Sequence, residues 1–193
     1  MKAKFTGLAL ILLFMAGCAS VPPVNCVALG RDSHVCLLPP AQLPALDGVH
    51  MITVDHNGKR QMFIGQLHID SQVIRLAGSS LFGPSLFTVS YDGDNLRSAP
   101  ADGRQRADLL IAMLEMVAAG QRTLQPALQG LTLTQTTTTD GKRLREFFQR
   151  GHLVVRIEMS AAPLTQAVIR FDIPSANLSV LMQPLVGQAA LQP

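Results

Sequence analysis

The sequence predicts an α+β domain, in which one strongly curved antiparallel sheet has a helix against its concave face. Short segments of alternating apolar and polar residues, separated by turn residues, fill most of residues 46–193 and indicate strands with one buried face. One segment with apolar residues at helical spacing interrupts them. The same pattern also allows a helix packed tightly on the half-barrel, with no cavity between the two.

Four strands are expected before the helix. Residues 49–55 and 60–70 flank Asn57-Gly58, a pair that is preferred in the tight turns of β-hairpins. Residues 72–77 and 85–91 have the same period-two alternation and continue the sheet as a meander. The order of the segments therefore predicts strands that are neighbours both in sequence and in space.

The helix is expected to begin near Asp102, a residue type common at helix N-caps, and to end at Gly120. Strands resume after it, and Asp140-Gly141 marks a second hairpin turn. The helical spacing is carried by Leu109, Leu110, Met113, Leu114, Met116 and Val117. The expected strands of the second half are residues 131–139, 142–150, 152–159, 166–173 and 178–182.

The N-terminus is typical of a bacterial lipoprotein signal. Two lysines precede a short apolar run, and the small residues Ala16-Gly17 stand directly before Cys18. We expect residues 1–17 to be cleaved, leaving Cys18 linked to diacylglycerol, and two or more acyl chains hold a protein firmly on a membrane. Ala19 stands where aspartate signals retention in the inner membrane, which favours the outer membrane, facing the periplasm. The alternatives are a secretory signal with an incidental cysteine and an uncleaved anchor helix.

The remaining cysteines, Cys26 and Cys36, are expected to form a disulfide, because the envelope outside the inner membrane is oxidising. Two unpaired thiols are the alternative, and no second pair of ligands accompanies them to suggest a metal. Residues 18–45 contain five prolines and few periodic apolar positions. Since proline removes backbone donors, this segment is expected to be an irregular, disulfide-stapled tether outside the sheet.

Composition argues against nucleic acid as a partner. The chain has 16 Lys and Arg against 13 Asp and Glu, and the two lysines of the signal leave 14 against 13 in residues 18–193. A nucleic-acid-binding domain needs a basic patch, which a nearly neutral chain does not predict. Charged residues make up 15% and hydrophobic residues 48%, so the chain can form a sizeable core.

No set of residues predicts catalysis, a metal or another cofactor, and we expect the protein not to be an enzyme. His68 and His56 stand beside acidic residues near turns and are expected to be solvated surface histidines. Gly78-Ser79-Ser80 superficially suggests a nucleophile, but a strand follows where a hydrolase elbow needs a helix. Glu115 falls where the helix could show one polar residue to water.

Several segments together resemble the DUF3261 family of Gram-negative lipoproteins. That family is similar in outline to the periplasmic lipoprotein carrier and the outer-membrane receptor of the Lol pathway, whose open β-barrels with helical lids enclose acyl chains. The resemblance implies that the curved sheet is an open, unclosed β-barrel with the helix as a lid over its concave face. It also implies an outer-membrane lipoprotein that binds or hands over a lipid-like molecule. Beside the lipoprotein signal, the resemblance rests on Cys36-Leu37-Leu38-Pro39-Pro40, Leu76-Ala77-Gly78-Ser79-Ser80-Leu81-Phe82-Gly83, Ser85-Leu86-Phe87-Thr88-Val89-Ser90-Tyr91-Asp92 and Leu109-Leu110.

We therefore expect an outer-membrane lipoprotein that binds or transfers an acyl or polyene lipid, or a lipoprotein, without chemical change. The alternative is a structural or assembly lipoprotein that docks on an envelope protein complex, and a filled interior would favour it. The ligand is expected to lie between the concave sheet and the helix. Its expected contacts are Phe63, Leu67, Phe87, Val89, Met113, Leu114, Val117, Leu153, Val155, Ile157 and Phe171.

Overall fold

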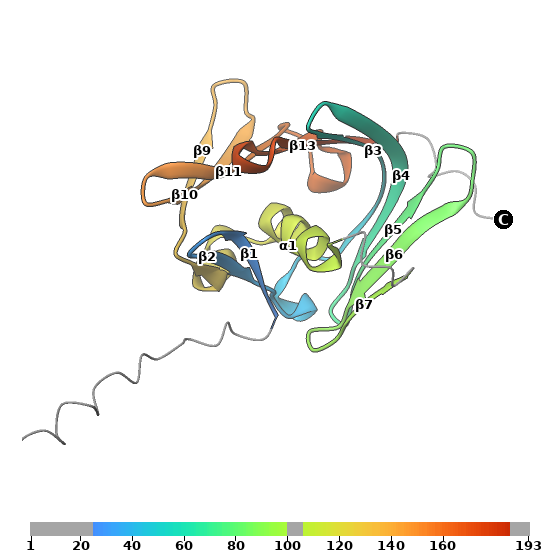
Figure 1. The fold of residues 1–193 in the computed structure, drawn as a ribbon, viewed down its shortest axis with the longest axis horizontal. Coiled ribbons are helices and arrows are strands. Elements are labelled where there is room, and N and C mark those ends of the chain that lie inside the picture. Colours follow the sequence, from blue (N-terminus) through green and yellow to red (C-terminus); the bar gives the residue numbers. More distant parts are fainter. Residues whose placement is uncertain (1–24, 100–105, 186–193) are drawn as a thin grey trace, which may run out of the picture.

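The computed structural model describes residues 25–99 and 106–185, and its main feature is a ten-stranded antiparallel sheet (Figure 1). The strand order is β7-β6-β5-β4-β3-β13-β12-β11-β10-β9, so β7 and β9 are the edges and the sheet does not close. The predicted open, curved sheet is confirmed. Its strands are β3 (Leu46–His56), β4 (Lys59–Ile69), β5 (Ile74–Ser79), β6 (Ser85–Tyr91), β7 (Leu96–Ala99), β9 (Thr132–Thr137), β10 (Arg143–Gln149), β11 (His152–Met159), β12 (Ile169–Ile173) and β13 (Leu178–Pro184).

The β3–β4 hairpin is the centre of this sheet. Its strands pair over their full length, from Leu46 with Ile69 to His56 with Lys59. Asn57 and Gly58 form the predicted tight turn with φ of 52° and 75°, the left-handed backbone that Asn and Gly tolerate best. The last strand, β13, pairs with the other side of β3 and thereby joins the two halves of the chain.

Two glycines allow the concave face to be closely packed where the sheet bends. A Cβ atom at Gly65 would collide with the side chain of Ile52 on the neighbouring strand, and one at Gly78 would collide with the ring of Phe87. Both glycines therefore leave room for a large side chain that crosses over from the adjacent strand.

The segment around the disulfide is a folded hairpin, which corrects the expectation of an irregular tether. β1 (Cys26–Gly30) and β2 (Ser33–Cys36) pair directly, and β8 (Leu128–Gln129) adds a third strand to this separate small sheet. Val27 and Val35 are buried in the same core as α1 and the large sheet. The five prolines obscured this short apolar alternation. The expected tether of residues 18–24 lies outside the described residues.

The helix α1 (Ala107–Ala118) lies inside the arc of the large sheet, beside the β1–β2 hairpin (Figure 1). The expected N-cap Asp102 lies outside the described residues, and Arg106 occupies the N-cap position. At the other end Ala119 is extended, so the helix ends at Ala118, two residues before Gly120. Single turns elsewhere connect the strands, namely α2 (Gln121–Leu124), η1 (Pro40–Gln42), η2 (Gln125–Ala127), η3 (Leu164–Gln166) and η4 (Pro174–Ala176).

A bulge in β11 changes which side chains face inward. Phe147 pairs with Val155 and Phe148 with Leu153, so Val154 is the extra residue. Strict alternation predicted a solvent-facing Val154, but the structure buries it to 7% exposure. Leu153, expected to face the concave side, is partly exposed instead. A bulge shifts the inward register by one residue, and the period-two pattern alone could not reveal it.

The disulfide leads to a stability prediction. Replacing Cys26 and Cys36 by Ala should lower the free energy of unfolding by about 2–3 kcal/mol, because the bond restricts a short loop of the unfolded chain. Urea unfolding of the full chain measures this difference. Alkylation with and without reduction provides the control, and two reactive thiols at these positions before reduction would contradict the bond.

Candidate ligand-binding site

An apolar cavity of about 290 Å³ lies between α1 and the concave face of the large sheet. The sheet contributes alternate residues of β3 and β13 together with single residues of β4 and β5. Alternation places them on one face, and the cross-strand pairs Ile52–Met182 and Val54–Val180 bring them side by side. The sheet residues that line the cavity are Ile52, Val54, Phe63, Leu76, Leu178, Val180 and Met182.

The helix contributes the opposite wall. Leu109, Leu110, Met113 and Leu114 are spaced one, three and four residues apart and therefore share one side of α1. Arg106, at the start of the helix, also lines the cavity. The wall is thus apolar along its length, with a guanidinium at one end.

Exposure differs among the residues that line the cavity. Ile52, Leu76, Leu114 and Val180 are at most 6% exposed. Val54 and Leu178 are partly exposed and lie near the β3–β4 turn. Hydrogen bonds join this turn to the β12–β13 turn through Asn57 and Asn177. Two paired turns therefore lie beside Val54 and Leu178.

The structure divides the expected contact residues between this cavity and a packed core. Phe63, Met113 and Leu114 line the cavity. Phe63 also packs edge-on against Phe87, with 5.5 Å between the ring centres. Leu153 lies beside the β11 bulge. The residues buried elsewhere in the core are Leu67, Phe87, Val89, Val117, Val155, Ile157 and Phe171.

Sequence reasoning did not select the wall that β13 provides. Leu178, Val180 and Met182 alternate visibly in the sequence, and this was the available signal. The pairing of β13 with β3, about 120 residues earlier in the chain, is what brings them to the cavity. Periodicity indicates the face of a strand but not its neighbours.

A buried arginine holds the C-terminal end of α1 to the sheet. Arg145 of β10 is 5% exposed, and its Nη1 donates to the carbonyls of Met116 at 2.7 Å and Val117 at 3.2 Å. Its Nε donates to Gln135 Oε1 on β9. The guanidinium thus donates hydrogen bonds to carbonyls that have no partner within the helix, at the end where the helix dipole favours positive charge.

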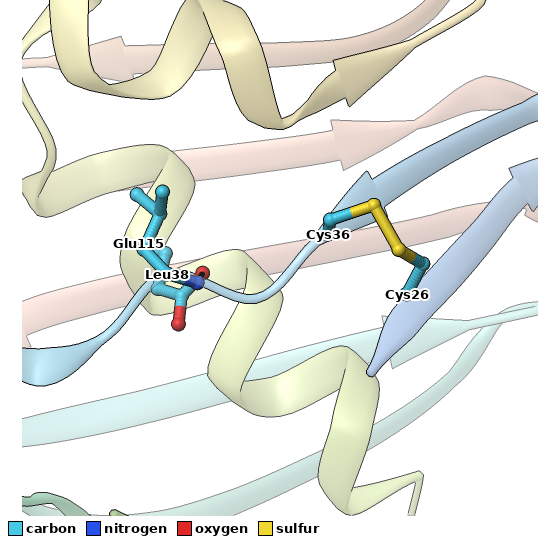
Figure 2. The surroundings of a disulfide bond; sticks show 4 residues. All are labelled: Cys26, Cys36, Leu38 and Glu115. Atoms are coloured by element: carbon cyan, nitrogen blue, oxygen red, sulfur yellow. Dashed lines mark hydrogen bonds between the residues drawn. A yellow bond between two sulfur atoms is a disulfide. The ribbon is translucent and has the colours of Figure 1, made fainter. Parts of the chain in front are cut away.

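Glu115 is fully buried, which corrects the expectation that it faces water. Its Oε2 accepts a hydrogen bond of 3.0 Å from the Leu38 amide, two residues after the disulfide (Figure 2). Its other oxygen has no hydrogen-bond partner among the described residues. Burial raises the pKa of Glu115 to about 8, against the smaller opposing effect of the Leu38 bond.

Two histidines have contrasting environments. His68 lies at the surface between Asp47 at 2.5 Å and Asp70 at 3.0 Å, and these hydrogen bonds raise its pKa. His50 is 1% exposed, and neither ring nitrogen has a partner among the described residues. Burial lowers the pKa of His50, so its ring is neutral. Residues 25–99 and 106–185 contain no cluster of three groups able to hold a metal.

The turn between β5 and β6 projects apolar side chains into solvent. Phe82 is 95% exposed and Leu81 is 42% exposed, and Gly83 follows with a φ of 115°. Strand pairing places this turn and the β3–β4 turn at the same end of the sheet. Leu86 and Met62, both partly exposed, lie near this end as well.

Glu115 leads to a prediction about pH. The folded protein keeps a proton at Glu115 that the unfolded chain loses near pH 4.5, so the free energy of unfolding should fall as pH rises from 4.5 to about 8. Glu115→Gln keeps an oxygen for Leu38 but cannot ionise. At pH 8 the variant should therefore be more stable than the unmodified protein, by on the order of a few kcal/mol.

Urea unfolding at several pH values measures this effect. His68 also titrates, and its raised pKa adds stability that is lost as pH rises above 6.5, but this contribution is common to both proteins. Glu158→Gln, on the partly exposed side of β11, is the matched control and should keep the parental slope. Equal slopes for Glu115→Gln and the parent would contradict a buried, protonated Glu115.

Among the helices of the described residues, none has the length and apolar character needed to cross a membrane.

Comparison with known proteins bears on the family of the chain. No curated protein matches the chain. A family model described as "Protein of unknown function (DUF3261)" matches residues 48–184, which span the large sheet from β3 to β13 together with α1. The chain belongs to the DUF3261 family.

Proposed function

We propose that this protein is an outer-membrane lipoprotein that binds a lipid-like molecule in the cavity beneath α1 and carries it or hands it over in the periplasm. The observation that carries the proposal is the apolar cavity of about 290 Å³ on the concave face. Ligand sites are typically concave, mostly apolar and largely formed in advance. A filled interior would have favoured the alternative, docking on an envelope complex.

In this proposal α1 acts as the lid. Its C-terminal end is held by Arg145 and by the bond between Leu38 and Glu115, whereas the side chains that line the cavity all precede Glu115 in the helix. A helix held at one end can move at the other without losing these bonds. Met113 suits such a wall because a thioether adapts to chains of different shape.

Binding and release would need no chemical step. Each methylene that leaves water for the cavity contributes about 0.8 kcal/mol, so even a short acyl chain provides a useful affinity. Transfer of the ligand would then depend on the movement of α1 and on how close the cavity comes to a membrane. The protein is accordingly proposed to be a carrier or receptor and not an enzyme.

Two features support the proposal that the protein acts at a membrane surface. The sequence around Cys18 has the form of a lipoprotein signal, although Cys18 itself lies outside the described residues. The exposed Phe82 lies at the same end of the sheet as Val54 and Leu178, two partly exposed residues of the cavity wall. An apolar tip there would bring the cavity close to the acyl chains of a membrane.

The chain contains no tryptophan, which allows a direct test of the cavity. In the variant Leu110→Trp, a brominated fatty acid should quench the new fluorophore, because residue 110 lines the cavity. Val168→Trp, at a surface position that is 40% exposed and away from the cavity wall, is the control and should not be quenched. Equal quenching of the two variants, or none at position 110, would exclude acyl binding at this site.

The anchor is tested separately. Cys18→Ser should abolish labelling of the full chain by palmitate and leave an unprocessed precursor, because the thiol that receives the diacylglycerol is removed. Gel mobility and the mass of the mature N-terminus measure both effects. Cys26→Ser is the control and should keep the label. Normal labelling of Cys18→Ser would refute the lipoprotein anchor.

A further inference from the structure

Arg106 is the one charged side chain among the described residues that line the cavity. Its side chain is 61% exposed, so Arg106 both lines the cavity and meets water. Arg106 also precedes the first turn of α1, where the helix dipole gives a partial positive charge. An otherwise apolar cavity thus has a positive end.

The guanidinium is held in place by a neighbouring carboxylate. Nε and Nη2 of Arg106 donate to the two oxygens of Asp108 at 3.0 and 2.9 Å. An arginine has five N–H donors in a rigid fork, and these bonds use two of them. Because Asp108 offsets the net charge, recognition at this point depends on directed donors and not on a general attraction for anions.

The cavity size limits the apolar part of the ligand. About 290 Å³ is at the lower end of the range for small-molecule sites, roughly 300–1,000 Å³. With α1 in the position that the structure shows, that space suits one acyl or polyene chain. In this position it does not suit the two or three chains of a phospholipid or of a lipidated protein N-terminus.

We infer that the cavity selects a single-chain amphiphile with an anionic head group, its chain between α1 and β3/β13 and its head at Arg106. The inference rests on the proposed function and adds the ligand class. A carboxylate and a phosphate share the necessary chemistry, since both accept parallel hydrogen bonds from a guanidinium. The alternative is that the stem of Arg106 only covers apolar surface and that its guanidinium contacts Asp108 and water without binding a head group.

Photolabelling of the full chain in phosphatidylcholine vesicles tests the inference. Two probes carry the same medium-length chain with a diazirine and an alkyne, one ending in a carboxylate and the other in an alcohol. We expect the acid to label cavity residues such as Met113 and the alcohol to label them about tenfold less, the value of one charge-assisted hydrogen bond. Alkyl phosphate and alkyl carboxylate, used as competitors, distinguish the two anionic head groups.

The variant Arg106→Gln should reduce labelling by the acid about tenfold and leave labelling by the alcohol unchanged. Arg97→Gln is the matched control, because Arg97 is exposed on β7, pairs with Asp92 and does not line the cavity. It should not alter either probe. A triacylated lipopeptide should compete much less than the fatty acid.

Failure of the inference can be told apart from failure of the proposed function. Equal labelling by acid and alcohol, or unchanged labelling of the Arg106→Gln variant by the acid, would overturn head-group selection while leaving acyl binding intact. Stronger competition by the triacylated lipopeptide would overturn the single-chain limit. No labelling of the cavity by either probe would overturn the inference and the proposed function together.

Discussion

A single curved sheet cannot cover its own concave face, and the rest of this structure follows from that constraint. Alternation gives β3, β4 and β13 one apolar side, which must be removed from water by elements outside the sheet. The chain supplies α1 and the small β1-β2-β8 sheet for this purpose, and both contribute to the same core. Where these elements pack fully the interior is filled, and where α1 stands away from the sheet the cavity remains.

The distribution of polar contacts explains why the cavity lies where it does. The C-terminal end of α1 is fixed by Arg145 of β10, which donates to its carbonyls, and by Glu115, which accepts from Leu38 in the segment after the disulfide. Burying an ionisable group is costly unless it is paired or neutral, and Glu115 meets this cost by a raised pKa. The part of the helix before Glu115 faces the sheet with the apolar side chains of Leu109, Leu110, Met113 and Leu114.

The disulfide hairpin has a structural role beyond cross-linking two cysteines. Cys36 stands two residues before Leu38, whose amide donates a hydrogen bond to Glu115 (Figure 2). The disulfide therefore restrains the segment that is hydrogen-bonded to α1. This sequence of contacts links the N-terminal segment to the wall of the cavity. Oxidation at Cys26 and Cys36 therefore bears on the position of α1 as well as on overall stability.

Local features of the sequence determined much of this fold. The alternation in residues 49–91 predicts the first meander correctly, because each hairpin joins strands that are adjacent in the chain. Asn57-Gly58 also predicts its turn correctly, because this turn needs only two neighbouring residues that tolerate a left-handed backbone. The helical spacing around Leu109-Leu110 likewise predicts α1, because the backbone hydrogen bonds within a helix join residues close in the chain.

The tertiary structure alone decided the contents of the concave face. Phe63, Met113 and Leu114 were expected at the site, but Val155 and Phe171 belong to the packed core and Val180 to the cavity. These assignments depend on which strand lies opposite α1, and strand neighbours such as β13 and β3 are set by contacts between distant residues. Glu115 was misplaced for the same reason, because periodicity gives the face of a helix and the surrounding core decides whether that face meets water.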